Sequence, residues 1–596
     1  MRAPFSLLIA ALCMSAPAAL SAQTLHQDIE VEQKVSVARR DAQPLTVLPE
    51  LALPPVAAAS LDYSARVVAT KVPNGVTTLE PAVFADPNLS TTHRGYAAIG
   101  LFPRYNLGVS AGYRAIATPT TRLNIWAQYD GDAYRRDGWL DANGDFHSTM
   151  WRDHAATLGL SLRRQLSRRR MLEVGVSGLW GRNNMPGYRS TAGQSAAKVD
   201  ARIALSSMLG DMKWRIGADY TYFGFFSLDV PASYTEPGND LTAVPQNPLS
   251  QHYARLSASA RLPMSESTAI GADFAGEMLS TSDHLRSFFP YGLHDQSYVF
   301  GTTTGLLRLT PYFRAANEHV TFKAGAELSA TLNDGRAFHV APQCLLAWTP
   351  SALFAIEARA HGGAQLNPTS WLYTDVTPYL NPYTAYSQSN IPLVADLRIA
   401  IGSFMGASLE ATAGYAKANG WLMPVETNDT YGGLIMGKTD VKGWRWGLAI
   451  AYDNGSNLEA RIGFTRTPGG VTNAWYADLD RARKQFDVRV AFRPMPALRL
   501  EAAYTVRASR STAIPVLVDD VVNDPATNRP IETVRPGLAC ASLGNAADLS
   551  AGASFQATEA LSFFVRGRNL LNNSYLMLGG RPAQGVTALV GAQLLF

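Results

Sequence analysis

The sequence predicts an all-β protein, a transmembrane antiparallel β-barrel of about 22 strands. Three observations support this fold class. Apolar and polar residues alternate with a period of two along most of the chain, short and long connections alternate between these segments, and the chain opens on an export leader. Together they describe strands with one apolar and one polar face in an exported protein.

The first 22 residues have the build of a signal peptide. Arg2 precedes an apolar stretch from Phe5 to Met14, and small residues follow up to Gln23. This stretch is too short for a membrane helix. Cys13 lies inside the apolar stretch, after Leu12 rather than a small residue, which disfavours a lipoprotein signal. We therefore expect residues 1–22 to be cleaved on export.

Composition excludes several classes of protein. The formal net charge of +4 over 596 residues is too small to indicate nucleic-acid binding. After the leader only Cys344 and Cys540 remain, too few for a disulfide-stabilised fold. Residues 23–92 show no regular alternation, and we expect them to form a periplasmic or lumenal segment ahead of a barrel that occupies residues 93–596.

The alternation is clearest near residues 443–505. Phe486, Val488 and Val490 share one face of a segment whose other face carries Asp487 and Arg489. An earlier segment has the same form, and its apolar face consists of Trp444, Trp446, Leu448, Ile450 and Tyr452. We count roughly twenty-two such segments. They start near residues 94, 106, 121, 154, 170, 196, 211, 251, 267, 302, 318, 336, 351, 391, 407, 443, 457, 484, 497, 546, 559 and 585.

The connections alternate in length. Those after even segments are brief, as at 163–170, 263–267, 349–352 and 494–496, and those after odd segments are long, as at 222–250, 279–301, 366–390, 417–442 and 507–545. Short periplasmic turns and long external loops are typical of an outer-membrane barrel. The first connection, "LFPRYN", is short where a long loop is expected.

Soluble β folds explain the pattern less well. A propeller would show a repeat of about 40–50 residues, which is missing here. A sandwich would bury its apolar face, whereas the apolar face of this chain carries aromatic residues near segment ends, as a membrane-interface girdle does. Since closed barrels satisfy their backbone in lipid without helices, we expect the outer membrane of the cell as the location and its lipid as a partner.

Motifs for catalysis or metal binding are weak. The Gly-x-Ser-x-Gly match at 108–112 continues a strand rather than a strand-to-helix turn. Asp141, Asn143 and Asp145 have the spacing of the first ligands of a calcium loop but lack the distal carboxylate, so an ordinary turn is favoured. The arginine-rich "RRQLSRRR" indicates a solvated turn. We expect no enzyme activity, no cofactor and no metal.

The end of the chain resembles that of a TonB-dependent receptor. Asn569, Leu570, Asn572 and Tyr575 match a motif of that family, and a Gly580-Arg581-Pro582 turn and a last strand ending in Phe596 follow. The resemblance implies a 22-stranded barrel, in agreement with the independent count. It also implies that Phe596 is the signal read by the barrel insertion machinery.

The resemblance fails at the front of the chain. The family has a plug of roughly 130–150 residues behind a short box that contacts TonB, whereas about 70 residues are available here. Asp28, Ile29, Glu30 and Val31 resemble the start of such a box and are the predicted TonB contact. We therefore expect a relative without a full plug.

Three functions fit these features. The first is transport of a solute across the outer membrane by a receptor-like barrel, with or without TonB. The second is a scaffold subunit of an outer-membrane assembly, secretion or surface-lipoprotein complex, and the third is a passive large pore. An aromatic-rich loop is the predicted site for a ligand or partner, through Trp371, Tyr373, Tyr379, Tyr383 and Tyr386.

Overall fold

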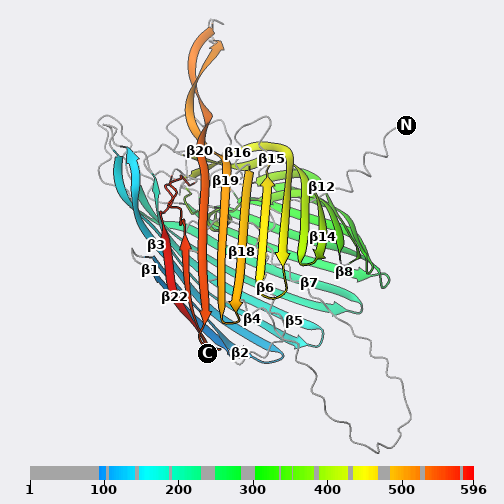
Figure 1. Ribbon diagram of the computed structural model, residues 1–596. Helices are drawn as coiled ribbons and strands as arrows, with labels where there is room; N and C mark the ends of the chain where they lie inside the picture. The colour runs from blue at the N-terminus through cyan, green and yellow to red at the C-terminus, as the bar shows by residue number, and fades with distance from the viewer. Residues whose placement is uncertain are drawn as a thin grey trace, which may run out of the picture. The chain divides into compact units, whose positions relative to one another are not determined.

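The computed structural model contains one closed antiparallel sheet of 22 strands (Figure 1). It describes residues 93–596 except for 103–105, 141–145, 187–190, 230–248, 283–302, 334–336, 352, 377, 381–387, 427–433, 468–483, 524–529 and 578–580. The predicted signal peptide and the segment 23–92 lie outside the described residues. Among the described residues, no helix is long and apolar enough to cross a membrane.

The strands follow one another around the ring in chain order, and β22 closes it against β1. The first eleven are β1 (Gly95–Phe102), β2 (Asn106–Ala117), β3 (Thr121–Leu140), β4 (Phe146–Ser167), β5 (Arg170–Pro186), β6 (Thr191–Leu209), β7 (Met212–Asp229), β8 (Ser250–Pro263), β9 (Thr268–Thr281), β10 (Thr303–Ala316) and β11 (Val320–Leu332). The others are β12 (Phe338–Ser351), β13 (Phe354–Leu366), β14 (Gln388–Phe404), β15 (Ala407–Glu426), β16 (Leu434–Asp453), β17 (Leu458–Arg466), β18 (Lys484–Met495), β19 (Leu498–Asn523), β20 (Pro530–Gln556), β21 (Leu561–Arg568) and β22 (Thr587–Leu595). The predicted fold class and strand number are confirmed.

The two ends of the barrel differ as predicted. Connections after even strands have two to four residues, for example 168–169 between β4 and β5 and 264–267 between β8 and β9. Most connections after odd strands are longer, such as 367–387 between β13 and β14. We call these the turn end and the loop end of the barrel, and the C-terminus lies at the turn end (Figure 1).

Three strands start earlier than the alternation predicted. β4 begins at Phe146 rather than near 154, β16 at Leu434 rather than near 443, and β20 at Pro530 rather than near 546. The expected loop at 507–545 is therefore mostly a pair of long strands, which rise above the rest of the sheet (Figure 1). Past the lipid the backbone ladder can continue, but lipid no longer requires an apolar outer face, so a strict period of two is not needed there.

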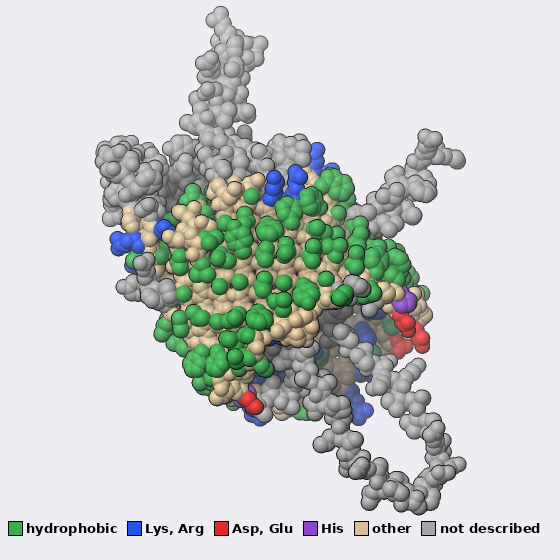
Figure 2. Space-filling model, viewed as in Figure 1, with side chains coloured by type: hydrophobic (Ala, Val, Ile, Leu, Met, Phe, Trp, Pro, Cys, Tyr) green, Lys and Arg blue, Asp and Glu red, His purple; other side chains and the backbone are tan. Residues whose placement is uncertain are grey.

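The outer surface of the barrel is apolar and its inner surface is charged. Figure 2 shows hydrophobic side chains across the strands that face the viewer. On β16 the predicted apolar face is confirmed, since its members are all exposed: Trp444, Trp446, Leu448, Ile450 and Tyr452. On the opposite face, Arg445 Nε donates to Asp396 Oδ1 of β14 at 2.8 Å. Further ion pairs join residues of different strands: Arg308 with Glu277, Arg215 with Glu173, Arg398 with Glu410 and Arg493 with Glu459.

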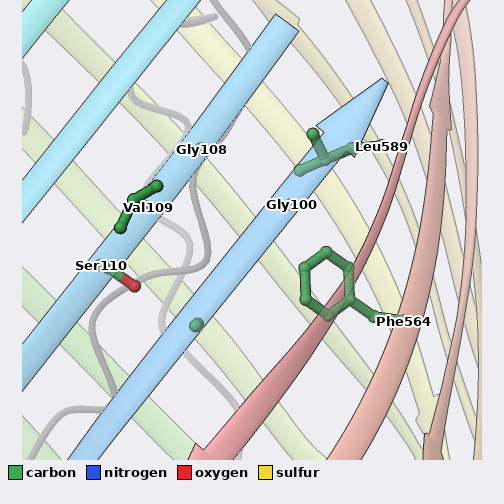
Figure 3. A pocket seen from close by; sticks show the side chains of 7 residues that line it. Gly100, Gly108, Val109, Ser110, Phe564 and Leu589 are labelled. Atoms are coloured by element: carbon green, nitrogen blue, oxygen red, sulfur yellow. The ribbon is translucent and has the colours of Figure 1, made fainter. Parts of the chain in front are cut away.

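The closing seam is built from glycines covered by large side chains. A Cβ on Gly100 of β1 would lie 2.7 Å from Leu589 Cδ2 of β22, and one on Gly591 would overlap the ring of Phe564 of β21. Leu589 and Phe564 thus lie on the inner face beside β1 and β2, where they line a small pocket with Gly108 (Figure 3). Glycine is needed here because no other residue admits these side chains so close to the backbone.

Candidate functional site

The candidate site lies inside the loop end of the barrel, where two connections fold inward. One is residues 367–380 between β13 and β14, called here the lumenal loop. The other is residues 569–586 between β21 and β22, of which 569–577 and 581–586 are described, called here the rim segment. Both connections follow odd strands, so they enter the barrel from the same end.

The lumenal loop starts on β13 and runs along the inner wall. It contains two short helical turns, α2 (Thr369–Trp371) and η2 (Leu372–Val376). Thr369 N donates to Gln251 Oε1 of β8 at 2.7 Å. Further along, the carbonyl of Pro378 accepts from Gln194 Nε2 of β6 at 2.9 Å and from Asn183 Nδ2 of β5 at 2.8 Å. Polar side chains of the wall therefore bind the backbone of the loop.

The end of the lumenal loop lies between opposite walls. The Tyr379 hydroxyl donates to Asp153 Oδ2 of β4 at 2.9 Å. The carbonyl of the same residue accepts from the amide of Leu434, the first residue of β16, at 2.8 Å, and Leu380 forms an isolated bridge with Leu434. Since β4 and β16 stand nearly half a ring apart, the loop bridges the lumen near its mouth.

Tyr373 fixes the middle of the lumenal loop to the wall. Its ring centroid lies 5.2 Å from that of Phe223 and 6.0 Å from that of Phe225, both on β7. Gly181 of β5 leaves the space for its hydroxyl, because a Cβ at that position would overlap Tyr373 Oη. The side chain is buried, and burial raises the pKa of its phenol. This contact is an aromatic anchor of the kind that packs inside folded cores.

Arg581 joins the rim segment to the lumenal loop and the wall. Its guanidinium is fully buried and pairs with Asp153 through Nη1 to Oδ1 and Nη2 to Oδ2, both at 2.7 Å. The same group lies over the rings of Tyr379, Trp151 and Tyr134, at 4.8, 5.2 and 5.3 Å from their centroids. A hydrogen-bonded ion pair beside three aromatic rings is among the stronger polar contacts that a protein forms.

Electrostatics favour the charged form of this arginine. Burial alone would lower the pKa of Arg581, but the attraction of Asp153 and the surrounding phenols outweighs burial and raises it well above its ordinary value. The Tyr134 hydroxyl accepts from Arg581 Nε at 2.9 Å and donates to the Pro582 carbonyl at 2.9 Å. The arginine is therefore held by hydrogen bonds from Nε and Nη1 and by its ion pair with Asp153.

The rim segment fills a low part of the barrel wall. β1, β2, β21 and β22 are short, whereas β3 and β20 on either side are long. Asn569 organises the segment: its Nδ2 donates to the carbonyls of Asn573 and Gln584, and its Oδ1 accepts from the Asn573 amide. Its left-handed φ of 45° is one that asparagine tolerates. The short first hairpin is thus explained, since the end of the chain completes the wall above it.

The structure places some of the predicted site residues and leaves others untested. Tyr373 and Tyr379 are buried in the lumen, Trp371 is half-buried in α2, and Phe596 lies at the seam. Tyr383 and Tyr386 lie outside the described residues. So do the predicted TonB contact, Asp28 to Val31, and residues 141–145, whose spacing resembles that of a calcium loop. In the described part of the chain, no group of three or more acidic, His or Cys side chains could hold a metal ion.

Sequence reasoning missed the partners of the aromatic loop. Asp153, Tyr134 and Trp151 occur as ordinary members of alternating strands, and no spacing links them to Arg581, more than 400 residues away. The pairing of β3 with β4 is the one signal that could have found them. It sets Tyr134 opposite Trp151 near the loop end, and inward polar or aromatic residues there indicate where a connection packs against the wall.

Comparison with solved structures identifies the type of barrel. A mutant form of the ferric enterobactin receptor PfeA from Pseudomonas aeruginosa aligns with a TM-score of 0.58 at 9% identity, over 85% of this chain and 80% of that chain. The siderophore receptor PirA from Acinetobacter baumannii gives 0.57 at 8%, over 84% and 80%. The outer membrane transporter YddB from Escherichia coli gives 0.54 at 10%, over 85% and 81%.

The fold is that of an outer-membrane receptor barrel. At these identities the likeness shows the fold alone, and it confirms the 22-stranded barrel that the resemblance to TonB-dependent receptors implied. A closed barrel with an apolar outer surface places the protein in an outer membrane. No protein-family model and no curated protein matches the sequence.

Proposed function

We propose that this protein transports a solute across the outer membrane as a receptor-like barrel. The observation that supports this most directly is a closed 22-stranded ring with a charged inner surface whose mouth is bridged by the lumenal loop. A ring of this size encloses more space than its own side chains fill. An occluded, polar passage suits regulated transport better than a passive pore.

Linkage to TonB is part of the proposal. Asp28, Ile29, Glu30 and Val31, within the segment 23–92 that follows the signal peptide 1–22, would form the contact. Two structural neighbours are receptors for siderophores or for ferric enterobactin. Ferric siderophores are therefore the first class of cargo to test, and loop residues including Trp371, Tyr383 and Tyr386 are proposed to contact it.

Deletion of residues 23–40 tests the energised mechanism. We expect uptake of the radiolabelled cargo to fall to background while the amount of barrel in the outer membrane stays constant. Deletion of residues 41–58, which has the same length and spares the proposed contact, is the control. Unchanged uptake after the first deletion would contradict a role for TonB.

Affinity purification from outer membranes separates transport from the scaffold function. A transporter should be isolated without a stoichiometric partner. A subunit of an assembly, secretion or lipoprotein complex would bring its partner with it, and that result would replace the transport proposal.

A further inference from the structure

We propose that Arg581, Asp153 and Tyr379 form a latch that holds the lumenal loop across the barrel, and that breaking this latch opens the lumen. The proposal rests on the proposed function, because only a protein that passes solutes uses an open lumen. It concerns regulation by the external connections themselves, independently of residues 23–92.

The latch joins three separate parts of the chain at one ion pair. Arg581 comes from the rim segment, Asp153 from β4 in the wall, and Tyr379 from the lumenal loop. The carboxylate of Asp153 accepts from both other residues at once, with distances of 2.7 Å from Arg581 Nη1 and 2.9 Å from the Tyr379 hydroxyl. Movement of any one part therefore affects the other two.

The environment makes the latch a two-state device. Asp132 of β3 is the direct cross-strand partner of Asp153 and is itself buried. If Arg581 withdrew, the half-buried carboxylate of Asp153 would lose its ion-pair partner while it faces Asp132, which is unfavourable. The closed arrangement is thus stable only while the rim segment is seated, and partial opening is disfavoured.

The rim segment combines exposed apolar side chains with a buried arginine. Leu570, Leu571 and Leu576 are exposed, between 39% and 48%, although Arg581 in the same segment has no exposed surface. A solute or partner that draws the rim segment outward would remove Arg581 from Asp153. The lumenal loop would then lose its attachment to β4.

Gly181 gives an independent way to displace the lumenal loop. Its missing side chain admits Tyr373 Oη, so Gly181→Ala should push Tyr373 off the wall without touching the ion pair. Gly175 lies on the same inner face of β5, and the nearest atom to a Cβ there is Leu160 O at 3.9 Å. Gly175→Ala is therefore a matched control with the same substitution on the same strand.

The test is conductance of the purified full-length protein in planar lipid bilayers. We expect the wild type to be mostly closed, and Arg581→Gln and Gly181→Ala to raise the open fraction by roughly tenfold or more, as loss of one member of a buried pair shifts a two-state equilibrium strongly. Gly175→Ala should behave as the wild type. So should Arg493→Gln, which removes a lumenal arginine paired with Glu459 instead.

Folding is checked in the same samples by the shift in gel mobility on heating that folded barrels show. Folded Arg581→Gln and Gly181→Ala proteins with wild-type conductance would overturn the latch, as would an equal effect of Gly175→Ala. The proposed transport function is judged separately by uptake in cells. Open variants in bilayers combined with no uptake by wild-type cells would support the latch and contradict transport.

Discussion

At the scale of single residues, Phe596 takes part in the hydrogen bonding that joins β22 to β1. The carbonyl of Phe596 accepts from the amides of Arg94 and Gly95 at 2.6 and 2.7 Å, and its own amide donates to Gly95 O at 2.9 Å. Its ring lies over Gly95 and stacks on Tyr113 with a centroid distance of 6.3 Å. The last residue therefore completes the hydrogen bonding that closes the ring.

Removal of Phe596 is predicted to impair assembly. The truncated chain loses three backbone hydrogen bonds at the seam and, by family resemblance, the signal for the insertion machinery. The amount of protein in the outer membrane, measured by immunoblot, should fall several-fold. Phe596→Tyr keeps both the ring and the backbone and should assemble as the wild type; normal assembly of the truncation would show the prediction to be wrong.

Gly591→Ala is predicted to destabilise the seam. Its methyl group would collide with the ring of Phe564 and with Ile99 O, and overpacking of this kind costs about 1–3 kcal/mol. The control is Gly108→Ala on β2, where the nearest atoms lie 3.9 Å from a Cβ. Thermal unfolding in detergent should show a lower midpoint for the first variant only.

At the scale of elements, β19 and β20 divide into a wall portion and a projecting portion. Residues 498–507 pair with β18 as well as β20, and residues 551–555 pair with β21 as well as β19. Beyond these, pairing continues between β19 and β20 up to Asn523 and Pro530, with one further bridge from β15. The projecting portion is therefore largely a two-stranded ribbon attached to a complete ring.

Replacing residues 511–542 with a short Asn-Gly turn is predicted to leave the barrel intact. The wall pairs of β19 and β20 remain, so the shift in gel mobility on heating and the thermal midpoint should be close to those of the full chain. As a contrast, deletion of the two paired wall segments 499–504 and 549–554 should abolish folding. If the first deletion also prevented folding, the ribbon would be needed for the ring.

At the scale of the whole molecule, the described residues form a complete ring. Among them, every strand pair of the sheet lies between Gly95 and Leu595, and β1 closes on β22. The lumenal loop and the rim segment bridge the mouth.

Residues 93–596 are therefore predicted to fold and insert when fused to a cleavable signal peptide. Their thermal midpoint should equal that of the full chain, and they should remain largely closed in planar bilayers, because the latch is intact. The full chain purified in parallel is the control. A wide, permanently open channel from this fragment would show that residues 23–92 occlude the lumen instead.

Most of the fold could be predicted from the sequence, since lipid outside and water inside impose a period of two on every spanning strand. That is why Trp444 to Tyr452 were assigned to the correct face and 19 of the 22 strand starts were found to within about five residues. The upper parts of β4, β16 and β20 were missed because outside lipid that constraint no longer applies. For the candidate site, Tyr373 and Tyr379 were singled out as part of a ligand or partner loop, which stays a prediction; the structure buries both in the lumen, and their partners were not predicted.

The sequence by itself determined the barrel and its membrane, because both depend on local periodicity and on a terminal motif. Only the tertiary structure decided that Arg581, within that same motif, reaches across to Asp153 and Tyr379. The physical reason is that ring closure brings β21 and β22 beside β1 to β4. Contacts between residues so distant in the chain leave no trace in local spacing, and they exist only once the ring is complete.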